Sequence, residues 1–183
     1  VMHLGMTGWV EVYDRAADRP RFWKLELVTE DGRRVAMTNA RRLGRIRLVD
    51  DPANEPPVSR LGFDPLLDMP PPATLRQILG GRRGPIKGVL LDQGVAAGVG
   101  NWIADEVLYQ ARVAPHRRCD TLGDDEVRRI RTALGRVVRK AVEVDADKRR
   151  FPRTWLFHHR WGRQDGVTTA RGERIMHETI AGR

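Results

Sequence analysis

The sequence is poor in cysteine and has no long apolar run. Cys119 is the single cysteine among 183 residues, which excludes an internal disulfide and fits a reducing compartment. No stretch approaches the roughly 18 apolar residues that a membrane span requires, and the first residues have the pattern of a strand instead of a signal peptide. We therefore expect an intracellular protein without a membrane segment, in which Cys119 is a passive thiol.

Acidic side chains are outnumbered by basic ones. Lysine and arginine together number 33 against 24 aspartates and glutamates, so the formal net charge is +9. The basic residues recur along the whole chain, which fits a polyanion such as nucleic acid, because binding releases counterions. A soluble basic protein without such a partner would carry the same charge, so charge alone leaves both alternatives open.

The chain divides by composition into a β part, a linker and a helical part. Residues 1–50 show strand patterns, including the alternation of Leu25 and Leu27 with polar neighbours and a hairpin turn at residues 30–32. Seven prolines in residues 51–72 predict a linker. The predicted fold class is α+β: part of an antiparallel β-sandwich, then a helical domain over residues 73–150 and a last region over residues 151–183.

Helical spacing is clearest after residue 120. We expect a helix there that begins at Asp120 or Thr121 as N-cap. Its apolar face comprises Val127, Ile130, Leu134, Val137, Val138 and Ala141. The arginines elsewhere on this helix are interpreted as a solvated face.

A glycine-rich turn connects two earlier helical segments. Gly94, Gly98 and Gly100 follow an apolar helix that runs up to residue 92, and Asn101 is the expected N-cap of a second helix over residues 102–112. Free N–H groups in the first turn of a helix attract anions such as phosphate. The pattern predicts an anion-binding turn, although a plain helix-packing corner would look similar.

Four segments together carry a family resemblance. Residues 86–106 read Ile-Lys-Gly-Val-Leu-Leu-Asp-Gln-Gly-Val-Ala-Ala-Gly-Val-Gly-Asn-Trp-Ile-Ala-Asp-Glu; residues 3–8 read His-Leu-Gly-Met-Thr-Gly; residues 39–44 read Asn-Ala-Arg-Arg-Leu-Gly; residues 61–66 read Leu-Gly-Phe-Asp-Pro-Leu. In this order they resemble the formamidopyrimidine-DNA glycosylase/endonuclease VIII family, whose DNA-binding domain contains a helix–two-turns–helix motif. The resemblance implies a glycosylase/AP lyase of base-excision repair that removes oxidised purines from duplex DNA by flipping the damaged nucleotide.

The resemblance implies a set of residues that fill the gap left by the flipped nucleotide. Met6 aligns with the family's void-filling methionine, and Arg41, followed by Arg42, aligns with the arginine that reaches the estranged base. Leu43 stands where most relatives carry a phenylalanine wedge, and leucine stacks less well. From the residues alone, Met6 could equally be a core strand residue, and Arg41 and Arg42 could form loop salt bridges.

Further residues match positions that touch the DNA backbone. Lys87, Gly100 and Asn101 are expected to bind phosphates near the lesion. Asp92 and Glu106 are interpreted as structural, because a carboxylate facing a phosphate would repel it.

The last region resembles the zincless finger of plant and fungal relatives. A finger that holds zinc through four cysteines is impossible with Cys119 alone, and we expect neither a metal nor a cofactor. Residues 167–176 could form a hairpin with Arg171 and Gly172 at its turn. Gly182 and Arg183 match the start of the family's Gly-Arg-Thr step, so Arg183 is an expected phosphate contact.

The family's catalytic groups have no counterpart in this sequence. Chemistry in the family begins with an N-terminal proline amine that forms a Schiff base, assisted by a glutamate and a lysine, all upstream of the strand that here begins at His3. We therefore expect residues 1–183 alone to hold DNA without cutting it, and we nominate no nucleophile among them.

Two other functions remain open at this stage. A non-catalytic module that binds damaged or abasic DNA would need the same residues. An RNA-binding protein is also conceivable, since a ribosomal protein carries a similar motif, but it explains neither Met6 nor residues 39–44. The expected partner is double-stranded DNA with a damaged or abasic nucleotide, bound by a monomer in the bacterial cytoplasm or the eukaryotic nucleus.

Overall fold

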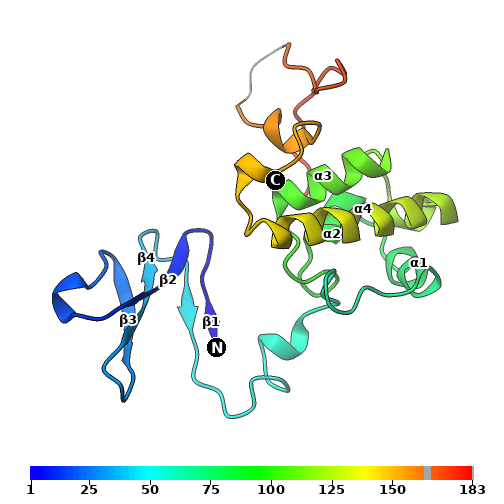
Figure 1. The fold of residues 1–183 in the computed structure, drawn as a ribbon. Coiled ribbons are helices and arrows are strands. Elements are labelled where there is room, and N and C mark those ends of the chain that lie inside the picture. Colours follow the sequence, from blue (N-terminus) through cyan, green and yellow to red (C-terminus); the bar gives the residue numbers. More distant parts are fainter. Residues whose placement is uncertain (163–165, 183) are drawn as a thin grey trace. The chain divides into compact units, whose positions relative to one another are not determined.

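The computed structural model describes residues 1–162 and 166–182. Short antiparallel strands come first along the chain and helices follow (Figure 1). This arrangement confirms the predicted α+β class. Among the described residues, no helix is long and apolar enough to cross a membrane.

The β part contains two small antiparallel sheets. Strands β2 (Gly8–Tyr13), β4 (Arg34–Asn39) and β3 (Trp23–Val28) form one sheet in that order. Strands β1 (Met2–His3) and β5 (Arg45–Ile46) form the other. The expected turn at residues 30–32 joins β3 to β4, and Gly32 takes the positive φ of +85° that glycine tolerates best.

Burial in this sheet follows strand position more than sequence alternation. The alternation in β3 predicts that Leu25 and Leu27 are both half-buried, yet Leu27 is 50% exposed while Leu25 is partly buried. The buried strand is β4, where Ala36 is 0% and Met37 3% exposed. The reason is that β4 lies between β2 and β3 and is covered on both edges.

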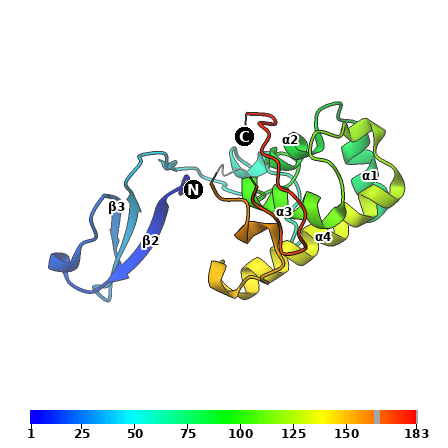
Figure 2. The same cartoon turned by 90° about the horizontal axis from the view of Figure 1, so that it is seen from above.

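Four helices form the second part. They are α1 (Pro72–Gly80), α2 (Ile86–Leu91), α3 (Asn101–Ala111) and α4 (Asp124–Glu143). Helix α4 packs along α3 and also contacts α1 (Figure 2). Short 3₁₀ turns at Cys119–Thr121, Lys148–Arg150 and Leu156–His158 connect or follow the helices.

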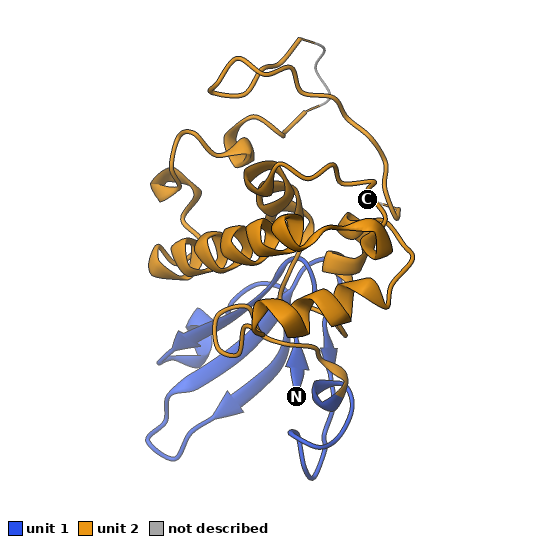
Figure 3. Ribbon diagram, turned by 90° about the vertical axis from the view of Figure 1, so that its right-hand side faces the viewer, with its two compact units in different colours: residues 1–59 blue, residues 60–183 orange. Residues whose placement is uncertain are grey.

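The chain separates into two compact units, Val1–Ser59 and Arg60–Arg183 (Figure 3). The boundary between them falls within residues 51–72, the segment expected to be a linker. Gly62 N donates a hydrogen bond of 2.8 Å to Gln93 O, and Ala97 N donates one of 2.9 Å to Phe63 O. The second half of this segment packs on the turn between α2 and α3.

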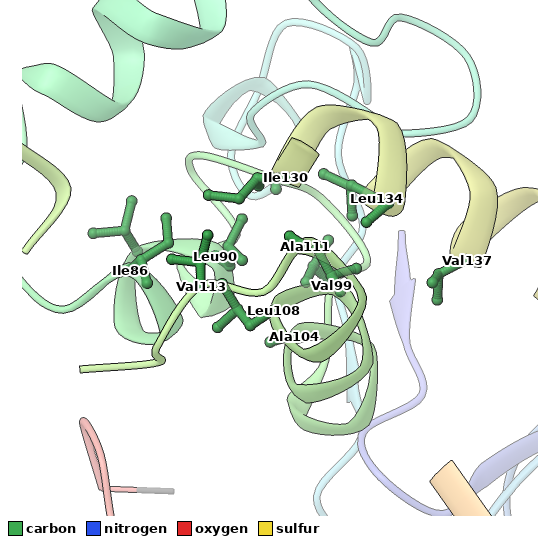
Figure 4. Close-up of a cluster of buried hydrophobic side chains, with 14 of the residues drawn as sticks. Ile86, Leu90, Val99, Ala104, Leu108, Ala111, Val113, Ile130, Leu134 and Val137 are labelled. Carbon is green, nitrogen blue, oxygen red and sulfur yellow. The ribbon is translucent and has the colours of Figure 1, made fainter. Parts of the chain in front are cut away.

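The core of the helical unit is apolar and contributed by every helix. Figure 4 shows Ile86, Leu90 and Leu108 from α2 and α3 close to Ile130 and Leu134 from α4. The predicted apolar face of α4 is confirmed. Val127, Ile130, Leu134, Val137 and Ala141 are buried, and Val138 is partly buried.

The predicted start of α4 is wrong by a few residues. Thr121 lies in a 3₁₀ turn, where its hydroxyl donates to Arg118 O at 2.9 Å, so it cannot cap the helix. Gly123 is the N-cap instead, and its N–H donates to Glu126 Oε2 at 2.9 Å. The glutamate at the third helical position therefore supplies one half of a capping box, by accepting from the N-cap amide, and glycine has no side chain to supply the other half.

Candidate nucleic-acid interface

The turn between α2 and α3 is held together by one glutamine side chain. Gln93 Nε2 donates to Leu91 O at 3.1 Å and to Val99 O at 3.0 Å, and Gln93 Oε1 accepts from Gly98 N at 2.9 Å. The amide thus ties the end of α2 to both sides of the glycine-rich turn. Sequence reasoning missed this role, because an amide between apolar and glycine residues gives no signal of which backbone groups it reaches.

Asp92 fixes the first step of the same turn, as expected. Its Oδ1 accepts from Gly94 N at 2.9 Å, and its Oδ2 lies 3.3 Å from Arg82 Nη1. Of the three turn glycines, Gly98 alone has a positive φ, at +76°. The turn is therefore held in one conformation by side-chain hydrogen bonds and is not a flexible glycine tract.

The start of α3 presents free backbone amides. Gly100 is the N-cap, with extended backbone and no side-chain hydrogen bond, so the predicted cap at Asn101 is wrong by one residue. Asn101 is the first helical residue, and its Oδ1 is buried without a hydrogen-bond partner within the described chain. No acidic residue lies in the first turn. An anion would be stabilised here by the helix dipole and the unpaired amides.

Lys87 lies in an ion cluster beneath this helix end. Its Nζ is 2.9 Å from Asp105 Oδ1, and its side chain is 7% exposed. Asp105 Oδ2 also lies 2.6 Å from Arg160 Nη2. One carboxylate thus faces two cations, which leaves a net positive charge. The resemblance implied a phosphate contact at Lys87, and in this structure the Lys87 ammonium lies against Asp105.

Glu106 anchors the segment after α4 to α3. It is 0% exposed, and its Oε2 accepts from Phe157 N at 2.9 Å while its Oε1 accepts from Gln110 Nε2 at 2.7 Å. Burial raises the pKa of the Glu106 carboxyl above its ordinary value, and the two hydrogen bonds oppose that shift. The expected structural role of Glu106 agrees with these contacts.

The last segment folds back onto α3 and α2. Thr168 and Arg174 form an antiparallel bridge, and Gly172 N donates to Thr169 O at 2.9 Å, as in a tight hairpin. Glu173 joins this hairpin to α3, because Tyr109 and Arg112 both donate to its carboxylate, at 2.6 and 2.7 Å. The two hydrogen bonds hold the pKa of Glu173 below its ordinary value.

The chain then passes α2 close to the ion cluster. A Cβ built on Gly88 would lie 2.9 Å from the Cβ of Ala181, so the backbones approach closely there. Arg183, the predicted phosphate contact, lies outside the described residues.

In the β unit, a buried asparagine joins the two loops that carry the predicted gap-filling residues. Asn39 is 1% exposed; its Nδ2 donates to Leu4 O at 2.7 Å, and its Oδ1 accepts from Leu43 N at 2.9 Å. Gly5 lies so close to Leu43 that a Cβ would be 2.9 Å from the Leu43 carbonyl carbon. The loop that contains Met6 therefore meets the loop of residues 40–44. The sequence placed Asn39 in the motif without assigning it this bridge.

Both loops expose the side chains that the sequence singled out. Met6 is 68% and Leu43 45% exposed, so Met6 is not a core residue. Arg41 is exposed as well, while Arg42, at φ +55°, lines a hollow of about 440 Å³ together with Lys24. The structure thus brings together Met6, Arg41 and Leu43 on neighbouring loops.

Cys119 is buried under α1, and burial raises the pKa of its thiol to about 11. It is a neutral, passive thiol at physiological pH, as expected.

Among the described residues, no group of three or more histidine, cysteine, aspartate or glutamate side chains could hold a metal ion.

Comparison with known proteins identifies the family. The description "Formamidopyrimidine-DNA glycosylase H2TH domain" matches residues 61–152, and "Formamidopyrimidine-DNA glycosylase N-terminal domain" matches residues 1–46. The chain is 38% identical to a formamidopyrimidine-DNA glycosylase of Arabidopsis thaliana over 163 residues, and 40% identical to one of Thermomicrobium roseum over 156 residues. These alignments span 89% and 78% of this chain but 42% and 54% of those proteins.

Solved structures show the same fold. The MutM (Fpg) protein of Thermus thermophilus matches with a TM-score of 0.76 and 33% identity, over 100% of this chain and 71% of that one. A Lactococcus lactis formamidopyrimidine-DNA glycosylase bound to DNA with an AP site matches with a TM-score of 0.80 and 21% identity, over 100% and 69%. With both family descriptions in register along its length, the chain belongs to the formamidopyrimidine-DNA glycosylase family.

Proposed function

We propose that this chain supplies the DNA-holding part of a DNA glycosylase/AP lyase that removes oxidised purines, of the formamidopyrimidine and 8-oxoguanine type, from duplex DNA. Because the chain spans about half the length of the relatives named above, the activity, substrate and partner are carried over as a proposal. The expected setting is intracellular and associated with DNA, with the chain acting as a monomer.

The exposed Met6 and Leu43 on joined loops carry this proposal. An extruded nucleotide leaves a gap in the base stack, and apolar side chains inserted into that gap keep it open. Met6 is flexible enough to fill the gap, and Arg41 beside it offers N–H donors to the orphaned base. Burying two apolar side chains that are 68% and 45% exposed in the free protein would favour the bent, open DNA.

The helical unit supports the same proposal through phosphate binding. The first turn of α3, which begins at Asn101, offers unpaired backbone N–H groups and contains no acidic residue. The cluster of Lys87, Asp105 and Arg160 adds a net positive charge at the same helix. We propose Gly100, Asn101 and Lys87 as backbone contacts, and Arg42 and Arg183 as further basic contacts.

Arg41→Ala tests the gap-filling role. It should weaken binding to a duplex with a tetrahydrofuran abasic site more than binding to the undamaged duplex, by roughly 1–2 kcal/mol for one lost hydrogen-bonding charge. Met6→Ala should act in the same direction. The measurement is fluorescence anisotropy on both duplexes at one salt concentration.

The matched control is Arg33→Ala, which removes one exposed arginine from the β3–β4 turn of the same unit. Arg33→Ala should lower the affinity for the abasic-site duplex and for the undamaged duplex slightly and by the same factor. Equal losses for Arg41→Ala on the two duplexes would show a general phosphate contact and would remove Arg41 from the gap.

Borohydride trapping tests whether residues 1–183 contain a nucleophile. We nominate none among them, so this polypeptide should form no covalent adduct with an abasic-site duplex, which makes its contribution DNA binding. An efficient adduct with this polypeptide would place a nucleophile within it.

A further inference from the structure

The middle of α4 is strongly basic. Residues 127–142 contain no carboxylate, and their cations are Arg128, Arg129, Arg131, Arg136, Arg139 and Lys140. The acidic residues of this helix stand at its ends, at positions 124–126 and 143. The helix runs along an edge of the helical unit (Figure 2). It therefore presents positive charge over about four turns without an acidic side chain of its own between them.

Three of these arginines are held in place without losing their charge. Each donates through Nε to a neutral oxygen of a neighbouring segment. The distances are 2.8 Å from Arg129 to Ala111 O, 2.7 Å from Arg131 to Pro70 O and 3.0 Å from Arg136 to Gln110 Oε1. A guanidinium has five N–H donors, so a bond through Nε leaves the two terminal nitrogens able to donate to an anion. The anchored side chains are therefore preorganised for phosphate or carboxylate.

Arg139 completes this surface. It is exposed, and at about 100° per residue it lies between Arg131 and Arg136 around the helix. We name Arg129, Arg131, Arg136 and Arg139 the α4 arginine face. Its length is about 15 Å along the helix axis, at 1.5 Å per residue. That length corresponds to about four successive phosphates of one DNA strand, at 3.4 Å per phosphate along the duplex.

The chemistry of the α4 arginine face favours a phosphate backbone over an acidic protein. Protein–protein interfaces have apolar residues at their centre, whereas DNA interfaces are polar and strongly positive. Within α4, Val142 is the exposed large apolar residue, and it lies beyond Arg139 toward the end of the helix. Phosphate contacts carry no sequence information, so binding here should depend on neither sequence nor damage.

This face lies away from the phosphate contacts proposed above. It contacts α3 at its last residue, Ala111, whereas Asn101 at the start of α3 is about 15 Å away along the axis. Asp105, which pairs with Lys87, is about 200° around α3 from Val107 in the core. Duplex DNA is stiff over its first ~150 base pairs, so a short duplex at the start of α3 does not also cover the outer side of α4.

We propose that the α4 arginine face binds the phosphate backbone of a second duplex segment, while the lesion-bearing duplex occupies the start of α3 and the gap-filling loops. One polypeptide then bridges two duplex segments. Binding at the second site releases counterions and is therefore sensitive to salt. The inference rests on the proposed function in taking DNA as the ligand and in assigning the lesion to the other site.

The test asks whether one polypeptide holds two short duplexes. A duplex with an abasic analogue is immobilised and saturated with the full chain, excess protein is washed away, and a fluorescent undamaged duplex is added. The parent chain should retain this second duplex, and the retention should fall as salt rises. Analytical ultracentrifugation of the same mixture in solution should show one polypeptide with two duplexes.

Arg136→Gln combined with Arg139→Gln removes two cations and leaves the bond of Arg129 to the end of α3 intact. This double variant should retain the second duplex on the order of tenfold more weakly, with a salt dependence that is shallower by about two units. Lysine at both positions keeps the charge, so Arg136→Lys with Arg139→Lys should restore most of the retention.

The matched control is Arg128→Gln combined with Lys140→Gln. It removes the same number of cations from the same helix, but these two are already paired, with Asp125 and Glu143. The control should weaken retention less than the double variant of the α4 arginine face does. Circular dichroism of each variant checks that it is folded.

Three results would overturn the proposal: no second duplex retained by the parent chain, two duplexes held only by two polypeptides, or equal losses for the double variant and its control. Displacement of the second duplex by polyglutamate at a lower concentration of charge than by unlabelled duplex would overturn it as well, in favour of an acidic protein.

The preference for an abasic over an undamaged duplex is measured separately. Arg136→Gln with Arg139→Gln should leave that preference unchanged. Retention is also measured on an immobilised undamaged duplex, so that failure of the lesion-binding proposal and failure of the second site are distinguishable.

Discussion

At the scale of single residues, charge alone was enough to assign a structural role to two carboxylates. Asp92 and Glu106 were interpreted as structural because carboxylates repel phosphate, and both are bound to backbone N–H groups. Gln93 and Asn39 were missed, because each bridges backbone groups that only the folded chain brings together. Lys87 illustrates the opposite case: its sequence position is that of a phosphate contact, but its partner Asp105 becomes visible only in the structure.

Lys87→Ala should lower affinity for duplex DNA and make its dependence on salt shallower by about one unit. When a phosphate binds Lys87, Asp105 keeps Arg160 as its partner, so the carboxylate is not left uncompensated. Affinity is measured at several salt concentrations. An unchanged slope would show that Lys87 serves only the ion cluster.

Glu106→Gln should change how stability depends on pH. Burial raises the pKa of Glu106 in the folded state, so its contribution to stability is complete below the ordinary pKa of about 4.3 and is lost as pH rises through the folded value. The neutral glutamine can still accept from Phe157 N. Urea unfolding should therefore show the variant gaining stability relative to the parent between about pH 4 and pH 7.

Asp125→Asn, which removes an exposed carboxylate at the start of α4, should show no such gain. If the free energies of unfolding of Glu106→Gln and of the parent differ by the same amount at about pH 4 and at about pH 7, ionisation of Glu106 does not limit stability.

At the scale of elements, helix existence was predictable and helix starts were not. Apolar spacing located α4, because the sequence repeats apolar residues at helical intervals there, and the glycine-rich turn followed by Asn101 located α3. Residue preference placed the caps at Asn101 and at Asp120 or Thr121, yet glycines occupy both N-caps. At α4, Glu126 accepts from the N-cap amide of Gly123, which is one of the two hydrogen bonds of a capping box.

Gln93→Ala should loosen the turn between α2 and α3. It removes three hydrogen bonds from a partly solvated side chain, so we expect a loss of about 1–2 kcal/mol in the free energy of unfolding and weaker DNA binding. The control is Gln77→Ala on the exposed face of α1, which should be nearly neutral. Comparable effects of the two variants would mean that Gln93 does not hold the turn.

At the scale of the whole molecule, charge and motif order predicted a nucleic-acid-binding α+β protein, and the fold and family agree. Composition indicated a linker over residues 51–72, but residues 62 and 63 pack on the helical unit because Gly62 allows the backbone of Val95 to approach. Such close approach depends on two distant segments meeting, which no local pattern encodes.

The central claim is that this chain binds duplex DNA in which one nucleotide is flipped out of the base stack. The most direct test is its affinity for a duplex with one abasic analogue against the identical undamaged duplex, measured at several salt concentrations. The account predicts tighter binding to the abasic duplex throughout, with the difference persisting as salt rises. Equal affinity for the two duplexes, from a folded protein, would contradict it.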